Sequence, residues 1–186
     1  MNLTGGYDTY IYLYLIAMKI NIKWKIALVS ALLLADGSLK ASFAQERFEK
    51  SVFYDVMASG DIDAVNNEIN IVEDSSLKNK EGYEGALLMK KAGLVRTAKK
   101  RLKLFKKGRI KLETALMAGD ENTEFHFLRL AIEENAPKVV KYHGDIEKDK
   151  LFVQNNFKNL SPSVQHAILN YCKKSKVLHP EDFSIR

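Results

Sequence analysis

Apolar residues recur every three or four positions through most of residues 47–172, which is the period of α-helices that each bury one face. In the segments 47–58 and 62–72 the apolar positions are Phe48, Val52, Phe53, Val56 and then Ile62, Val65, Ile69, Val72. Ser59-Gly60-Asp61 separates them and offers N-cap residues for the second helix. The polar segment 73–80 that follows predicts a loop.

Two further segments, 81–94 and 96–118, predict a third and a fourth helix. The third contains Gly82 and Gly85, which lower helix propensity, and we expect them to let another backbone come close. On the fourth helix, one arc of the helical wheel gathers Leu94, Ala98, Leu102, Phe105, Gly108, Leu112 and Leu116. Arg101 and Arg109 fall inside or beside this arc. Glu113 follows Arg109 by one turn, so these two side chains are expected to meet.

The fifth helix, opened by Gly119-Asp120 and ending near Asn135, is predicted to be the central one. Its apolar residues cover too much of its circumference for a helix with one buried face: Phe125, Phe127, Leu128, Leu130, Ala131 and Ile132. Arg129 lies among them and must either snorkel or pair with a buried carboxylate. A sixth helix capped by Asp145 and a seventh opened by Ser161-Pro162 follow, and residues 176–186 are expected to form an irregular tail.

Seven helices and no convincing strand predict an all-α domain over residues 45–175, packed as antiparallel hairpins. Phe105, Gly108, Leu112, Ala115 and Leu116, with the following turn Gly119-Asp120-Glu121-Asn122, resemble the second helix and inter-repeat turn of a tetratricopeptide repeat. The resemblance implies a tetratricopeptide-like helical hairpin protein. Asp120 stands where that family prefers proline, and no second copy follows at the family's spacing of about 34 residues.

The N-terminal part has the pattern of a targeting signal. Lys19, Lys23 and Lys25 precede the apolar run 26–35, and the small residues Ser42 and Ala44 define a cut before Gln45, so residues 18–44 are interpreted as a secretory signal peptide. The alternative is an uncleaved membrane anchor, for which the apolar run is short. No transmembrane span is expected in the mature chain.

Residues 1–17 carry no positive charge, and we interpret them as an extension from an upstream start, with Met18 as the true start. Cleavage near Ala44 would export the helical domain to the periplasm or outside the cell. A signal peptide followed by such a helical body resembles small uncharacterised exported proteins of the Bacteroidetes.

Positive charge is concentrated in one segment. Residues 90–111 hold eleven basic residues and no acidic one, although the whole chain has a net charge of only +6. Seven cations form a basic face opposite the apolar arc of the fourth helix: Arg96, Lys99, Lys100, Lys103, Lys106, Lys107 and Lys111. We interpret it either as a solvated surface neutralised by acidic residues of the fifth and sixth helices, or as a candidate anion-binding surface for lipid or acidic polysaccharide. Nucleic acid is not an expected partner, because this face lacks aromatic residues for base stacking.

The residues that could carry chemistry are dispersed. Four histidines, at positions 126, 143, 166 and 179, form no metal-binding motif, and His126 is expected to be partly buried and hydrogen-bonded. Cys172 is the chain's one cysteine, which excludes an internal disulfide, and we expect an inert buried thiol. Glu113, Glu124 and Glu133 could converge in space. We predict no catalytic, cofactor-binding or metal-binding residues and no cofactor.

The sequence therefore predicts an exported, non-enzymatic helical protein, a protein-binding or scaffolding module of the cell envelope with an unknown protein partner. The alternative is an envelope protein that docks on anionic lipid or polysaccharide through the basic face of the 96–118 helix. A third hypothesis is an enzyme whose site includes Glu113, His126 and Arg129.

Overall fold

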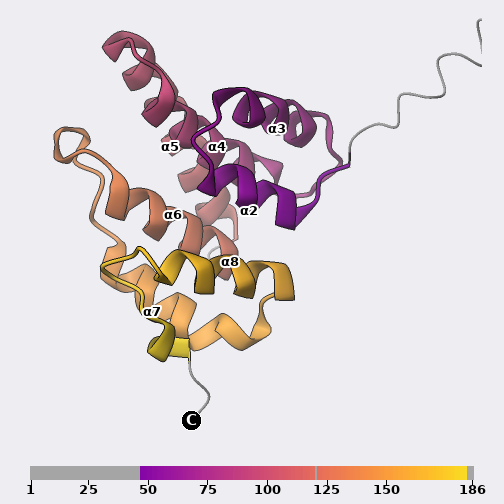
Figure 1. Cartoon of the computed structure of the whole chain (residues 1–186), viewed down its shortest axis with the longest axis vertical. Coiled ribbons are helices and arrows are strands. Elements are labelled where there is room, and N and C mark those ends of the chain that lie inside the picture. Colours follow the sequence, from indigo (N-terminus) through magenta and orange to yellow (C-terminus); the bar gives the residue numbers. More distant parts are fainter. Residues whose placement is uncertain (1–46, 120, 184–186) are drawn as a thin grey trace, which may run out of the picture. The chain divides into compact units, whose positions relative to one another are not determined.

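The computed structural model describes residues 47–119 and 121–183. These residues form seven α-helices: α2 (Lys50–Ala58), α3 (Ile62–Asp74), α4 (Lys80–Leu94), α5 (Ala98–Ala118), α6 (Thr123–Asn135), α7 (Ile146–Asn156) and α8 (Pro162–Cys172) (Figure 1). Short 3-10 segments are η2 (Lys138–Val140), η3 (Phe157–Asn159) and η4 (Pro180–Phe183). The described ranges contain no strand, so the predicted all-α class is confirmed. The predicted signal peptide and the extension before it lie outside the described residues.

Three helices begin where the predicted capping residues place them: α3 after Asp61, α7 after Asp145 and α8 after Ser161. Asp61 caps α3 as expected, because its carboxylate accepts the backbone N–H groups of Asp63 and Ala64. The start of α6 differs from the prediction. Asn122 is the N-cap residue, and its side-chain oxygen accepts the N–H groups of Glu124 and Phe125.

One other predicted helix start and one predicted cap are also corrected. The helix predicted from Arg96 begins at Ala98, since Thr97 is extended and occupies the N-cap position. Asp145 occupies the N-cap position of α7, but its side chain makes no capping hydrogen bond. Its backbone N–H instead donates to a carboxylate oxygen of Glu133, at 2.9 Å, and so ties the start of α7 to the end of α6.

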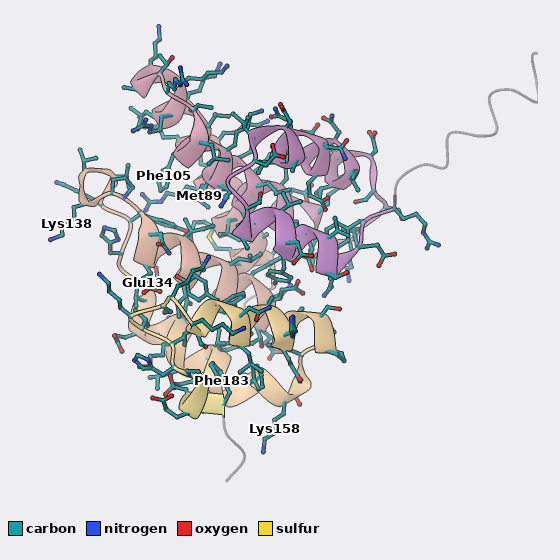
Figure 2. All side chains as sticks on the ribbon, in the orientation of Figure 1. Met89, Phe105, Glu134, Lys138, Lys158 and Phe183 are labelled. Atoms are coloured by element: carbon teal, nitrogen blue, oxygen red, sulfur yellow. The ribbon has the colours of Figure 1, made fainter. Side chains whose placement is uncertain are left out.

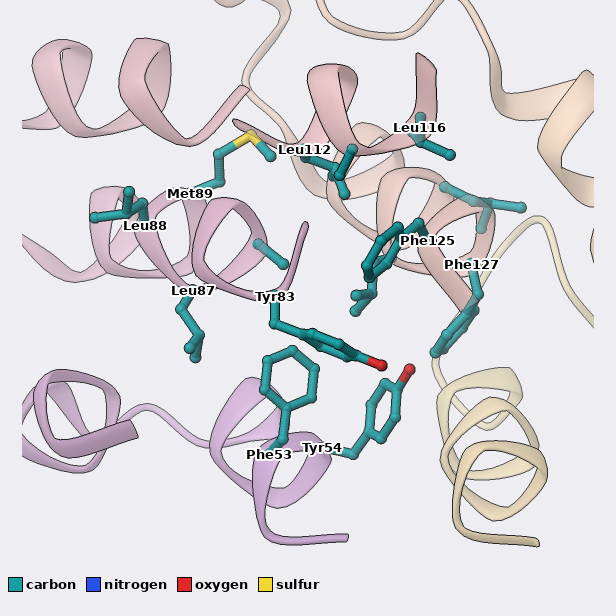
Figure 3. Packing of buried hydrophobic residues seen from close by; sticks show 14 of the residues in the cluster. Phe53, Tyr54, Tyr83, Leu87, Leu88, Met89, Leu112, Leu116, Phe125 and Phe127 are labelled. Carbon is teal, nitrogen blue, oxygen red and sulfur yellow. The ribbon is translucent and has the colours of Figure 1, made fainter. Parts of the chain in front are cut away.

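The core is built around α4 and α6. Nine of the 15 residues of α4 and nine of the 13 residues of α6 are buried, so the predicted central helix (α6) shares that position with α4. Aromatic rings from three helices meet between them, as Figure 3 shows for Phe53, Tyr54, Tyr83, Phe125 and Phe127. The rings of Tyr83 and Phe125 pack edge to face with centroids 5.1 Å apart, a favoured aromatic geometry.

Glycines set the distance between α4 and α5. A Cβ atom on Gly85 would lie 2.6 Å from the backbone nitrogen of Leu112 and 2.7 Å from the carbonyl oxygen of Gly108. The two backbones therefore touch, as expected from the sequence. For Gly82 the same expectation is wrong, because the ring of Phe125 rather than a backbone fills the space beside it.

The C-terminal segment packs on the domain more closely than expected. Glu134 accepts hydrogen bonds from three of its groups: the Tyr171 hydroxyl (2.6 Å), the Ser175 hydroxyl (2.7 Å) and the Lys176 backbone N–H (2.5 Å). Leu178 is fully buried, and η4 follows it. Residues 176–183 lack a helical period, so the sequence pattern could not show that a carboxylate on α6 would hold them.

We predict that Gly85→Ala destabilises the fold by about 1–3 kcal/mol, because the added methyl group would force two touching backbones apart. Gly93→Ala, in the same helix, is the matched control. Nothing lies within 4 Å of a Cβ atom there, so the higher helix propensity of alanine should stabilise the fold by up to about 1 kcal/mol. Urea unfolding followed by circular dichroism measures both, and shifts of the same sign would contradict this account of the α4–α5 contact.

Candidate functional site

The basic face is divided by its ion pairs. Six of the seven predicted cations are exposed, and Lys111 is half-buried. Lys107 and Lys111 bind Glu84 of α4, with Nζ–Oε distances of 3.5 and 2.8 Å. The acidic partner of these two lysines was expected on the fifth or sixth predicted helix. That expectation is wrong, because Glu84 lies on α4. Although burial opposes ionisation of Glu84, the hydrogen bonds and charges of Lys111 and Lys107 hold the pKa of this carboxyl below its usual range.

The cations at the start of α5 have no such partner. We call these six residues the basic tip: Arg96, Lys99, Lys100, Arg101, Lys103 and Lys106. All six are exposed, and within the described ranges no carboxylate lies at salt-bridge distance from any of them. In Figure 2, side chains that end in nitrogen surround this end of α5. The basic tip is thus a solvated cluster of like charges.

Arg101 was expected to turn toward the packed side of its helix, and this expectation is wrong. Its side chain is exposed and donates to the carbonyl oxygen of Val95, with an Nη2–O distance of 3.1 Å. Leu102, which was assigned to the apolar arc, is 47% exposed. The physical reason is that the buried residues of α5 begin only at Phe105, so in the described part of the chain its first turn has no buried side chain. A helical wheel cannot show where along a helix its neighbours end.

Arg109 is also exposed, and its predicted pairing with Glu113 is replaced by two other contacts. The guanidinium of Arg109 lies over the ring of Tyr142, 4.7 Å from the centroid. Glu113 accepts a hydrogen bond from the Tyr142 hydroxyl and another from Arg129 at 3.0 Å. Arg129 and Tyr142 come from distant parts of the chain, so the local spacing of Arg109 and Glu113 did not decide the pair.

Arg129 is the centre of a buried charge network. Its Nε and Nη2 atoms donate to the two carboxylate oxygens of Asp149, each at 2.7 Å, and Asp149 is fully buried. This two-pronged geometry is the strong form of an arginine–carboxylate pair. Of the two alternatives for Arg129, pairing with a buried carboxylate is confirmed. The spacing of Asp149 could have identified that partner, since it lies three residues after Ile146 and four before the buried Val153.

His126 completes the same network. Its Nδ1 atom lies 2.6 Å from an oxygen of Asp149, and its ring stacks on Phe152 with centroids 4.2 Å apart. The expectation of a hydrogen-bonded, buried histidine is confirmed. Glu113 reaches this network, whereas Glu124 binds Lys50 and Tyr54 instead, so the three predicted glutamates do not meet at one site.

Two buried carboxyl groups near Arg129 have opposite pKa shifts. Burial opposes ionisation of Asp149, but hydrogen bonds from Arg129 and His126 hold its pKa below the usual range. Burial raises the pKa of Glu133, although the backbone N–H of Asp145 partly offsets this effect. One oxygen of Glu133 is buried and has no hydrogen-bond partner within the described ranges. The fold therefore favours the charged form of Asp149 and disfavours the charged form of Glu133.

The buried network holds elements together and offers little to a ligand. Arg129, His126 and Asp149 are all buried and bind one another across α6 and α7. Among the residues that the structure describes, no three histidine, cysteine or acidic side chains are grouped so that they could hold a metal ion. None of the described helices combines the length and apolar character needed to cross a bilayer. Cys172 is buried, and burial raises the pKa of its thiol to about 11.

We predict that Asp149→Asn destabilises the fold by up to about 3–5 kcal/mol at pH 7, because it removes the fully buried counter-charge of Arg129 and leaves only the more exposed carboxylates of Glu113 and Asp145 beside it. Glu133→Gln is the matched control in the same network, and we expect it to be neutral or stabilising because it removes a charge that burial disfavours. The free energy of unfolding in urea measures both. An equal loss in the two variants would contradict the opposite roles of these carboxyl groups.

The pH dependence of the two variants should also differ in sign. The pKa of Asp149 is lowered in the fold, so its contribution is present above the unfolded value of about 3.9 and is lost as the pH falls below it. The stability gap between wild type and Asp149→Asn should therefore narrow in acid. The pKa of Glu133 is raised, so wild type should instead gain stability relative to Glu133→Gln as the pH falls. Unfolding curves between about pH 3 and 7 test both trends.

Comparison of the chain with protein families, with curated proteins and with solved structures finds no match in any of the three. A functional conclusion must therefore come from the chain's own residues. The buried network is enclosed by packed helices, whereas the basic tip is exposed, so the basic tip is the feature of the two that a partner can reach.

Proposed function

We propose that this protein is a non-enzymatic binding module that docks on an anionic surface through the basic tip. The observation that carries the proposal is that six cations gather at one exposed end of α5 without a carboxylate beside them in the described part of the chain. Clusters of one sign attract oppositely charged surfaces over a distance of about a Debye length.

The arrangement of these charges is unfavourable in the isolated protein. Lys99 and Lys103 are four residues apart, and Lys103 and Lys106 are three apart, so like charges are neighbours on the helix surface. The first turn of α5 contains Lys99 and Lys100 and no acidic residue, although the helix macrodipole favours negative charge there. The N-cap residue Thr97 makes no side-chain capping hydrogen bond. An external anion would relieve all three costs, which supports docking as the role of this end of the helix.

A protein-binding groove receives less support from the geometry. That hypothesis expects the first helix of each hairpin to line a surface for the partner. The corresponding helices α4 and α6 are the most buried of the fold and present few side chains to solvent. Export, as predicted from residues 18–44, would place the basic tip in the cell envelope, where anionic lipids and acidic polysaccharides are available.

The test changes Lys99, Lys100, Lys103 and Lys106 to Gln, which removes four charges of the basic tip and leaves the Glu84 pairs intact. Binding to vesicles that contain phosphatidylglycerol, or to immobilised dextran sulfate, should fall by roughly a hundredfold or more, at about fivefold for each charge. Binding by the wild type should also weaken steeply as salt is raised.

The control variant changes Lys78, Lys148, Lys158 and Lys173 to Gln, four exposed lysines on other elements. It has the same net charge as the tip variant and should bind almost as well as wild type. If both variants lose the same affinity, net charge rather than the basic tip explains the binding. Salt-insensitive binding by the wild type would also rule the proposal out.

A further inference from the structure

We infer that the anionic surface is a phospholipid bilayer, and that the side chains of Leu102 and Val139 enter its interface while the lysines around them bind headgroups. This inference rests on the proposed function and adds the chemistry of the partner. It comes from exposed apolar side chains that stand among the cations.

Both apolar side chains are flanked by exposed basic residues. Leu102 is 47% exposed between Arg101 and Lys103 of the basic tip. Val139 is 84% exposed in η2, the most exposed of the fold's large apolar side chains, and its exposed neighbours in the chain include Lys138. Two separate segments thus present the same combination of an aliphatic side chain and positive charge.

These two segments lie next to each other in the fold. The rings of Phe105 and Tyr142 pack edge to face with centroids 5.7 Å apart, and Arg109 covers the same tyrosine ring. Leu102 lies three residues before Phe105 on the same side of α5. Val139 lies in η2, three residues before Tyr142 in the chain. Figure 2 shows Phe105 and Lys138 on the same side of the molecule. The chain that follows η2 is therefore held against α5 at Tyr142.

The backbone of the η2 turn supports a role for its charge. Lys141, exposed at the end of η2, has φ 49° and ψ 51°, the left-handed conformation that glycine adopts without steric cost. Among the described residues other than glycine, it is the one with positive φ. A lysine in this position adds a cation beside Val139 at a cost in backbone strain, and such strain is commonly found at binding sites.

A bilayer fits this surface better than a polysaccharide does. An acidic polysaccharide would pair with the lysines but would leave Leu102 and Val139 in water. The interface of an anionic bilayer receives both kinds of side chain, because cations meet the headgroups while aliphatic groups reach the acyl chains just below. Moving either side chain out of water should strengthen binding by roughly tenfold.

The experiment places a single tryptophan at each position in the full chain. Trp24 is the chain's one tryptophan, so Trp24→Phe gives a background in which Leu102→Trp or Val139→Trp supplies the whole signal. Val52→Trp is the matched control, since Val52 is also 47% exposed and lies on α2, which packs against α3 and α8. Circular dichroism checks that each variant folds. The vesicles contain phosphatidylglycerol with either ordinary or brominated acyl chains.

We expect brominated chains to reduce the emission of the tryptophans at positions 102 and 139 about twofold, because interfacial side chains lie within reach of the acyl bromines. Emission from position 52 should not change. Residues 1–44 are the same in all three variants apart from the common Trp24→Phe change. Any membrane binding by that segment therefore cannot produce quenching that depends on the labelled position.

Two results overturn the inference: no quenching at positions 102 and 139, or equal quenching at all three positions. If the former occurs while dextran sulfate is still bound through the four lysines of the basic tip, the anionic partner is a polysaccharide and the proposed function survives. If the four-lysine variant binds both vesicles and dextran sulfate like the wild type, the proposed function itself fails.

Discussion

The contact between Gly85 of α4 and Gly108 of α5 fixes how α5 lies on the rest of the fold, and with it the position of the basic tip. Without Cβ atoms at these two places the helix backbones touch, and α5 is held firmly over its middle and its C-terminal half. The buried residues of α5 begin only at Phe105, so its first turns are largely exposed. The close contact between α4 and α5 lies at Gly108, and the basic tip precedes it on α5 and is exposed. The charges of the basic tip are solvated by water.

Charge is distributed in this fold according to burial. Three buried acidic side chains are paired with a cation: Asp149 with Arg129, Glu124 with Lys50, and Glu84 with Lys107 and Lys111. Each of these pairs links helices that are adjacent in space, so the interior uses acidic groups as connections. The lysines at the start of α5 have no carboxylate at salt-bridge distance in the described part of the chain. A protein whose sequence outside residues 90–111 is net acidic thus presents a strongly basic end.

The proposed docking surface combines this charge with apolar side chains from a second segment. Tyr142 is the residue that joins the two, since its ring contacts Phe105 and Arg109 while its hydroxyl binds Glu113. Burial raises the pKa of this hydroxyl, so it stays a hydrogen-bond donor at any physiological pH. The buried network thus helps to hold Tyr142 beside α5, and it would support the proposed docking surface through that contact.

The sequence by itself determined the all-α class, the seven helices, most of their ends and the basic face, because helical periodicity, capping residues and charge are local properties of the chain. It also predicted a partly buried His126, and it left open whether Arg129 snorkels or pairs with a buried carboxylate. Only the tertiary structure decided which carboxylate each cation meets, that Arg101 and Leu102 face solvent, and that Tyr142 packs against Phe105 of α5. Those outcomes depend on which helices end where and which residues distant in sequence become neighbours. The sequence pattern of a single segment contains no information on where neighbouring helices end or on which distant residues pack beside it.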